Sequence, residues 1–166
     1  MKSLTSILLL IASLAGFCLT ACAAPQNDDS QAKVSEHIKT ASFEGYIFPK
    51  EHLVMGLFLK IPQENGYTLN SRQVIQAEKI IQKHKSEVLN VCPSVNLRTY
   101  KRQYFGEIDK NGDIIVHITM YERSLVEDKE LAEDDVFILD GGCEIIHIDV
   151  NLSRGTILDI FNNGYA

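Results

Sequence analysis

An apolar stripe of helical period between residues 71 and 89 constrains the fold of this chain more than any other pattern. Its members recur at spacings of three and four: Val74, Ala77, Ile81, His84 and Val88. Asn70 can cap the first turn, with Gln73 at the third helical position. The pattern predicts an amphipathic helix from Ser71 to about Leu89. A helix with one apolar face must cover another apolar layer.

The chain after Cys92 has the patterns of a β-sheet. Asn111 and Gly112 form a strong hairpin signal, because both residue types tolerate the positive φ angles of tight turns. Residues 114–121 alternate in character, as expected of a strand with two different faces. Further strands are predicted at Phe43–Phe48, Leu53–Leu59, Leu97–Ile108, Val136–Leu139, Cys143–Val150 and Thr156–Phe161. We expect the acidic stretch Glu122–Asp135 to be a loop or a poorly formed turn of helix.

These elements predict an α+β domain in which one amphipathic helix packs on a curled antiparallel sheet. A helix followed by four antiparallel strands, the third one bulged, resembles the cystatin-like α+β roll. The stretches Phe137–Cys143 and Asn163–Ala166 are similar in pattern to the tails of small uncharacterised exported bacterial proteins. The resemblance implies a fold and assigns no functional residue.

The first residues have the pattern of a secretory signal peptide. Lys2 provides a positive start, an apolar run follows from Ile7 to Leu14, and small residues surround Ala21. A helix that crosses about 30 Å of hydrocarbon needs roughly 20 apolar residues, which this run does not reach. We therefore expect the mature protein to have no membrane span of its own.

Leu19, Thr20 and Ala21 precede Cys22, and this order resembles the lipobox of bacterial lipoproteins. The resemblance implies that residues 1–21 are removed as a signal peptide. It also implies that Cys22 receives lipid, which anchors the chain to the membrane.

Ala23 follows the cysteine in place of an aspartate, which resembles lipoproteins sent on to the outer membrane. We expect a lipid-anchored cell-envelope protein, in the outer membrane and facing the periplasm if the source is Gram-negative. The alternative is ordinary cleavage at Ala21–Ala23, which leaves a soluble secreted protein. Residues 22–41 are polar and predict a flexible tether, followed by a single domain over 42–166.

The cysteine count supports export. Removal of Cys18 and lipidation of Cys22 leave Cys92 and Cys143, and an even pair in an oxidising compartment predicts a disulfide. Closing a loop of about 50 residues would stabilise the fold by roughly 4 kcal/mol in the chain-entropy model. Two buried free thiols are the alternative.

The chain is acidic, with 16 basic and 22 acidic side chains, which disfavours nucleic acid as a partner. Residues 72–102 carry seven basic and two acidic side chains, whereas residues 103–166 carry four basic and fourteen acidic ones. Such an asymmetry can steer a charged partner. Solvated faces that neutralise one another are the alternative explanation.

We expect a partner-binding surface formed by Arg98, Lys101, Arg102 and Tyr104, because basic and aromatic side chains act as anchors at interfaces. Packing across strands is the alternative for these side chains. The chain then serves as a non-enzymatic binding, accessory or inhibitor module for another envelope protein. No motif predicts a catalytic residue, a metal or a cofactor.

Two other functions stay open. A small envelope hydrolase needs His117 and His147 to converge with nearby carboxylates, and a metal there needs a third ligand such as Asp149 or Glu144. A carrier of apolar ligands needs an open pocket between the sheet and the helix.

The lipobox generates a direct test. Metabolic labelling with a fatty-acid analogue should mark the wild-type protein and leave Cys22→Ser unmarked, because the cysteine is the only proposed acceptor. An unlabelled wild-type protein that fractionates with soluble periplasmic proteins would contradict the anchor.

Overall fold

The computed structural model describes residues 35–52, 54 and 59–164. The expected signal peptide, Cys22 and most of the expected tether lie outside these residues, as does most of the strand expected at Leu53–Leu59. Within them the helices are α1 (Ser71–Lys83), α2 (Lys85–Val91) and α3 (Asp128–Glu133). The strands are β1 (Glu36–Lys39), β2 (Glu44–Ile47), β3 (Gly66–Tyr67), β4 (Tyr100–Ile108), β5 (Ile114–Glu122), β6 (Ile145–Asn151) and β7 (Thr156–Asn162). No helix in this described part is long and apolar enough to cross a membrane.

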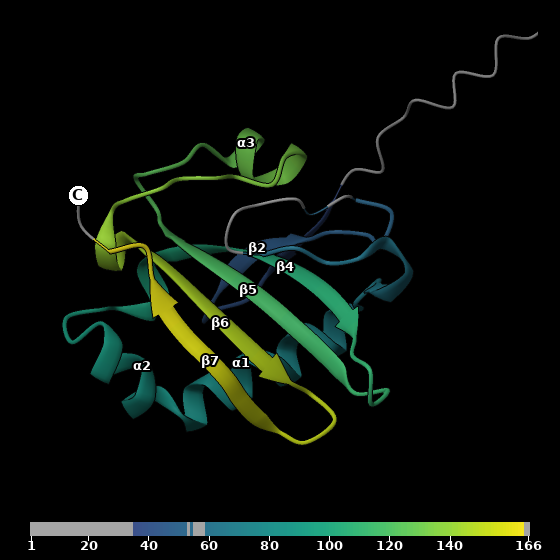
Figure 1. The fold of residues 1–166 in the computed structure, drawn as a ribbon. Helices are drawn as coiled ribbons and strands as arrows, with labels where there is room; N and C mark the ends of the chain where they lie inside the picture. Colours follow the sequence, from purple (N-terminus) through teal and green to yellow (C-terminus); the bar gives the residue numbers. More distant parts are fainter. Residues whose placement is uncertain (1–34, 53, 55–58, 165–166) are drawn as a thin grey trace, which may run out of the picture. The chain divides into compact units, whose positions relative to one another are not determined.

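The seven strands form one mixed sheet in the order β1-β2-β4-β5-β6-β7, with β3 paired to the end of β4. The helices α1 and α2 lie on one face of the sheet and α3 lies on the other (Figure 1). The predicted α+β class is therefore confirmed. The expectation of a purely antiparallel sheet is wrong, because β2 runs parallel to β4. Parallel neighbours need a long crossover, which the chain from β3 to α2 supplies.

The single long helix that we expected is divided in two at His84. Its start is as predicted, since the Asn70 side chain accepts the backbone N–H groups of Arg72 and Gln73, and the Gln73 side chain accepts that of Asn70. His84 leaves helical geometry with φ −102° and ψ 24°. Its Nδ1 lies 2.7 Å from Glu87 Oε1 in the next helix. Both helices still bury the predicted apolar stripe against the sheet.

The strands β4 to β7 follow one another as an antiparallel meander, as predicted, with shifted ends. The predicted hairpin joins β4 to β5. Only Gly112 has a positive φ in this turn, so Asn111 does not need the conformation that we expected of it. The Asp109 carboxylate instead accepts the backbone N–H groups of Asn111 and Asp113 and closes the turn.

Three other segments differ from the expectation. Strand β1 lies in the stretch expected to be a tether, where only Ile38 is buried and no alternation marks a strand. Residues 136–139 join no strand, because the side chains of Gln103 and Tyr121 bind the backbone of Val136. The acidic stretch contains the short helix α3.

Arg102 and Tyr104 of β4 bury their side chains on the face of the sheet that α1 and α2 cover. Arg102 is 0% exposed, and its Nε lies 2.7 Å from Oε1 of Glu78 on α1. The other guanidinium nitrogens donate to the backbone oxygens of Tyr100 and Leu97 at 2.6 and 2.8 Å. The Tyr104 hydroxyl donates to the same Glu78 oxygen at 2.9 Å. The side chains of Arg102 and Tyr104 thus join the sheet to α1 through the Glu78 carboxylate.

Cys92 and Cys143 are joined by a disulfide with Cα atoms 5.6 Å apart, as the even cysteine pair predicted. The bridge spans 51 residues. It ties the end of α2 to the turn that precedes β6, so that it links the helix layer to the sheet.

The buried ion pair generates a stability test. Arg102→Met leaves the Glu78 carboxylate buried without its cation and should lower the free energy of unfolding by about 3 to 5 kcal/mol. Tyr104→Phe removes one hydrogen bond and should cost about 1 kcal/mol. Arg98 is exposed in the same segment, so the control Arg98→Met should cost less than about 0.5 kcal/mol. Urea unfolding measures all three, and equally small effects of the two arginine changes would contradict the ion pair.

Candidate functional site

His117 and His147 come from neighbouring strands and face the side of the sheet away from α1 and α2. The register of β5 and β6 places His117 opposite Asp149 and Thr119 opposite His147, so the two histidines are diagonal neighbours. The sheet thus brings His117, His147 and Asp149 close together, and these are three of the residues that the hydrolase hypothesis requires. Glu144, the alternative third ligand, lies exposed in the turn before β6.

The buried ring of His117 has a carboxylate at each nitrogen. Nδ1 lies 2.8 Å from Asp149 Oδ1, and Nε2 lies 3.0 Å from Glu107 Oε2. Burial alone would lower the pKa of His117, but the hydrogen bonds and charges of Asp149 and Glu107 outweigh it, and the pKa is raised. When the ring is protonated it donates from both nitrogens to these carboxylates, and in that state neither nitrogen accepts a proton or binds a metal.

The ring of His147 is held by uncharged side chains. Its Nε2 lies 2.8 Å from Asn163 Oδ1, and its Nδ1 lies 3.2 Å from Thr119 Oγ1. The ring stacks on Phe161 with centroids 4.6 Å apart. Burial lowers the pKa of His147. Among residues 35–52, 54 and 59–164, no group of three or more His, Cys, Asp or Glu side chains is placed to hold a metal ion.

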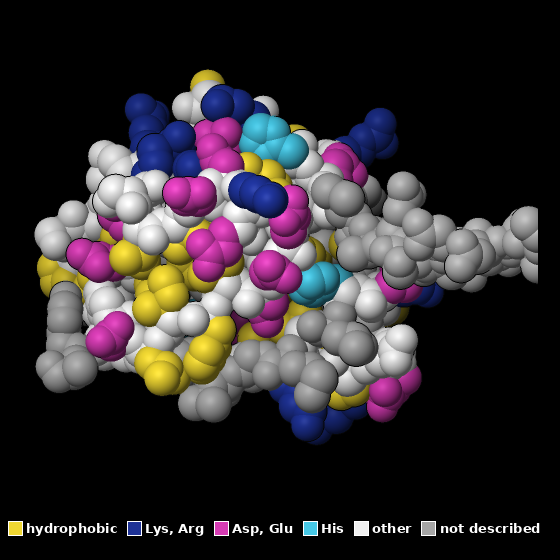
Figure 2. Space-filling view, turned by 90° about the horizontal axis from the view of Figure 1, so that it is seen from above, with side chains coloured by type: hydrophobic (Ala, Val, Ile, Leu, Met, Phe, Trp, Pro, Cys, Tyr) yellow, Lys and Arg dark blue, Asp and Glu magenta, His cyan; other side chains and the backbone are white. Residues whose placement is uncertain are grey.

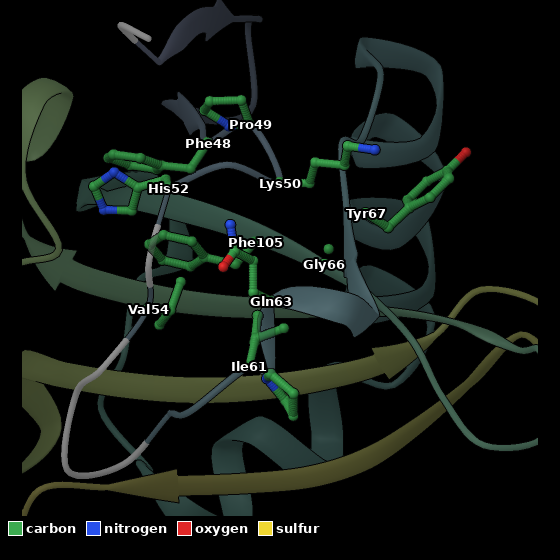
Figure 3. A pocket seen from close by; sticks show the side chains of 12 residues that line it. Phe48, Pro49, Lys50, His52, Val54, Ile61, Gln63, Gly66, Tyr67 and Phe105 are labelled. Atoms are coloured by element: carbon green, nitrogen blue, oxygen red, sulfur yellow. The ribbon is translucent and has the colours of Figure 1, made fainter. Parts of the chain in front are cut away.

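A small pocket lies beside the segment that follows β2. The rings of Phe48, His52 and Phe105 face one another there (Figure 3), with the two phenylalanine rings stacked at 4.8 Å. Burial lowers the pKa of His52. The pocket has a volume of about 10 Å³, which is room for one water molecule. This pocket is too small for the apolar ligand of a carrier.

The basic and aromatic segment that we expected to contact a partner lies mostly inside the domain. Arg102 and Tyr104 are 0% exposed, and Lys101 is buried with its ammonium paired to Asp128 of α3. Of the four expected contacts, only Arg98 is exposed. The expectation of an exposed patch is therefore corrected. The central position of β4 in the sheet places these side chains between two covering layers.

The face that carries α3 exposes acidic and apolar side chains together (Figure 2). We call residues 125–140 the acidic face, since they include seven acidic side chains and a single basic one, Lys129. Leu125 is 37% exposed, Phe137 44% and Leu139 62%. Burial raises the pKa of Asp135 to about 6. Exposed apolar side chains that form a contiguous patch with a polar rim are typical of surfaces that bind other proteins.

The side chain of Gln103 fixes the acidic face to the sheet. It is 0% exposed, and its Nε2 donates to the backbone oxygens of Leu131 and Asp134 at 2.9 and 2.6 Å. Its Oε1 accepts from the backbone N–H of Val136 and from the Tyr121 hydroxyl. A fully satisfied buried amide holds its partners in one geometry. Sequence reasoning missed Gln103, because a lone glutamine in a strand carries no signal.

Compared with models of known protein families, with curated proteins and with solved structures, the chain gives no match. The function is therefore inferred from the residues described above. Among them, the acidic face combines exposed apolar side chains with mostly acidic ones. The side chains of His117 and His147, in contrast, are used in contacts between strands.

The raised pKa of His117 adds stability at low pH. This contribution is complete below the unfolded pKa of about 6.5 and is lost as the pH rises through the folded value. We expect His117→Gln to destabilise the protein more at about pH 5.5 than at about pH 9. The control His147→Gln should show the opposite trend, because a lowered pKa adds stability that is lost as the pH falls. Chemical unfolding measures both, and a pH-independent effect of His117→Gln would contradict the charged ring.

Proposed function

We propose that this protein is a lipid-anchored cell-envelope protein whose single α+β domain binds another envelope protein through the acidic face. The domain acts as a non-enzymatic binding, accessory or inhibitor module. The observation that carries the proposal is the exposure of Leu125, Phe137 and Leu139 among acidic side chains, on a segment that Gln103 holds to the sheet.

The anchor in this proposal is Cys22, which Leu19 and two small residues precede in lipobox order. The Cys92–Cys143 bridge supports an oxidising compartment. If the source is Gram-negative, Ala23 favours the outer membrane, with the domain facing the periplasm. Anchoring confines the domain to the membrane surface and raises its effective concentration for a partner on the same membrane.

The partner that fits the acidic face carries basic and apolar side chains. Opposite charges raise the rate of encounter, while buried apolar contacts provide most of the affinity. The state of His117 supports binding over hydrolysis, because Asp149 and Glu107 occupy both of its ring nitrogens.

The finer description of the fold is also a proposal, namely that α1 and β4–β7 form a cystatin-like roll. A helix followed by four consecutive antiparallel strands supports it. The register shift between Asp149 and Val150 of β6 leaves Leu158 of β7 without a partner in the pairing, so the bulge lies in the fourth of these strands and not in the third, where the resemblance places it.

Photo-crosslinking in intact cells tests the binding surface. A photoreactive residue in place of Leu139 should give a defined adduct with one envelope protein that mass spectrometry identifies, because this position is the most exposed apolar one of the acidic face. Leu158 is 55% exposed on β7 and provides the matched control position. The same substitution there should not give this adduct.

Charge reversal in α3 completes the test. Glu130→Lys combined with Glu133→Lys should reduce the adduct at least about tenfold, by repelling a basic partner. Glu64→Lys, at an exposed acidic residue outside the acidic face, should leave the adduct unchanged. The proposal would be contradicted by an adduct that forms from position 158 instead of 139. It would also be contradicted if the yield of the adduct were unchanged in the variant with both α3 charges reversed.

A further inference from the structure

The two cysteines of the disulfide differ in their exposure to solvent. Cys92 is 0% exposed within the apolar core beneath the sheet. Cys143 is partly exposed and lines an open groove of about 440 Å³, together with residues that include Tyr100 and Glu144. A thiol that enters the groove therefore reaches Cys143 first.

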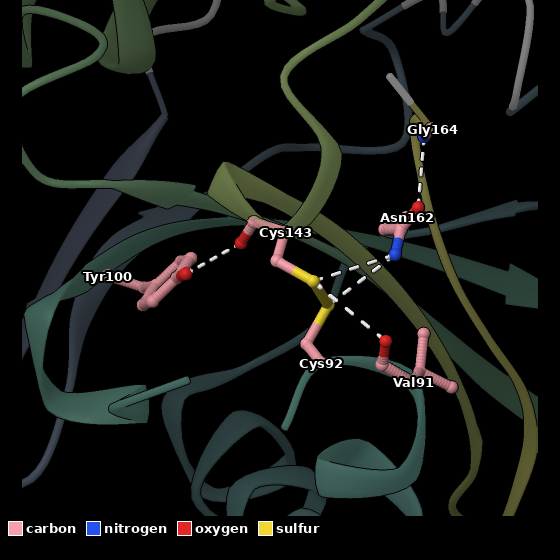
Figure 4. The surroundings of a disulfide bond; sticks show 6 residues. All are labelled: Val91, Cys92, Tyr100, Cys143, Asn162 and Gly164. Carbon is pink, nitrogen blue, oxygen red and sulfur yellow. Dashed lines mark hydrogen bonds between the residues drawn. A yellow bond between two sulfur atoms is a disulfide. The ribbon is translucent and has the colours of Figure 1, made fainter. Parts of the chain in front are cut away.

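The side chain of Asn162 on β7 contacts both sulfurs (Figure 4). Its Nδ2 lies 3.5 Å from Cys92 Sγ and 3.6 Å from Cys143 Sγ. Its Oδ1 accepts the backbone N–H of Gly164 at 2.9 Å, which orients the amide with its N–H groups toward the sulfurs. An N–H donor stabilises a thiolate more than a neutral sulfur, because a hydrogen bond to a charge is stronger.

We propose that this bridge is a thiol–disulfide exchange site for a dithiol partner protein. A thiolate of the partner attacks Cys143 Sγ from the groove, the bond between the two sulfurs breaks, and Cys92 leaves as a thiolate that Asn162 stabilises. The second thiol of the partner attacks the mixed disulfide and releases Cys143. The two thiols of the partner are thereby oxidised to a disulfide, and their two electrons reduce the Cys92–Cys143 bond. The two protons that the partner's thiols lose are taken up by Cys92 and Cys143.

Two contacts besides the bridge itself hold the turn around Cys143. The Tyr100 hydroxyl donates to the backbone oxygen of Cys143 at 2.6 Å, and the backbone N–H of Gly142 donates to the oxygen of Gly164 at 2.6 Å. The sulfurs therefore stay close, and the reverse reaction with the oxidised partner closes the bridge again. This exchange depends neither on the acidic face nor on the lipid anchor.

Glutathione, applied in a redox buffer to the folded protein, tests the order of attack. Mass spectrometry of acid-quenched samples should find glutathione on Cys143 at least about tenfold more often than on Cys92, since only Cys143 lines the groove. Equal labelling of both cysteines would overturn the proposal. A bridge that resists reduction until denaturant unfolds the protein would also overturn it.

The role of Asn162 has a separate test. Asn162→Leu removes the N–H donor and should shift the equilibrium with dithiothreitol at least about threefold toward the closed bridge. Asp159→Asn, on the same strand, is the matched control and should leave the equilibrium unchanged. Thermal unfolding checks that each variant is folded. If Asn162→Leu does not fold, the labelling of wild-type Cys143 and Cys92 by glutathione decides the proposal. An unchanged equilibrium in folded Asn162→Leu would overturn the role of the amide.

Discussion

An arginine without exposed surface in the middle of the sheet is the constraint on which the rest of the structure depends. Removing the Arg102 guanidinium from water costs several kcal/mol unless a carboxylate and other acceptors replace the water. Glu78 supplies the carboxylate from α1, so neutralising the charge requires the helix to lie over β4. Apolar side chains of α1 such as Val74 and Ile81 are buried in the core on the same face of the sheet. Apolar packing alone tolerates several positions of a helix on a sheet, whereas the ion pair selects one.

The next side chain of β4 holds the opposite layer. Since side chains alternate along a strand, Gln103 points away from α1 and binds the backbone of the α3 segment. One strand therefore fixes both layers and uses its polar groups inside the domain. His117 also uses its polar groups inside the domain, because carboxylates on the two neighbouring strands bind both of its ring nitrogens. Because these side chains of β4 are used inside the domain, we place the proposed binding surface on the acidic face rather than on β4.

Features that depend on near neighbours in the chain were predictable from the sequence. The cap at Asn70, the turn at Gly112 and the alternation of β5 each involve residues a few positions apart. The buried state of β4 was not predictable, because its partners are distant: Tyr104 and Glu78 are 26 residues apart. A strand with basic and aromatic residues has the same composition whether those side chains meet a partner protein or a buried carboxylate. The parallel pairing of β2 with β4 likewise depends on a crossover that no local pattern reveals.

Arginine-selective labelling of the native protein tests the burial of Arg102 most directly. Phenylglyoxal reacts with accessible guanidinium groups, and mass spectrometry reports the extent of reaction at each arginine. Arg98 should react at least about tenfold faster than Arg102, and the two should react alike only after denaturant opens the domain. Equal reaction of both arginines in the native protein would place Arg102 at the surface and contradict the buried ion pair.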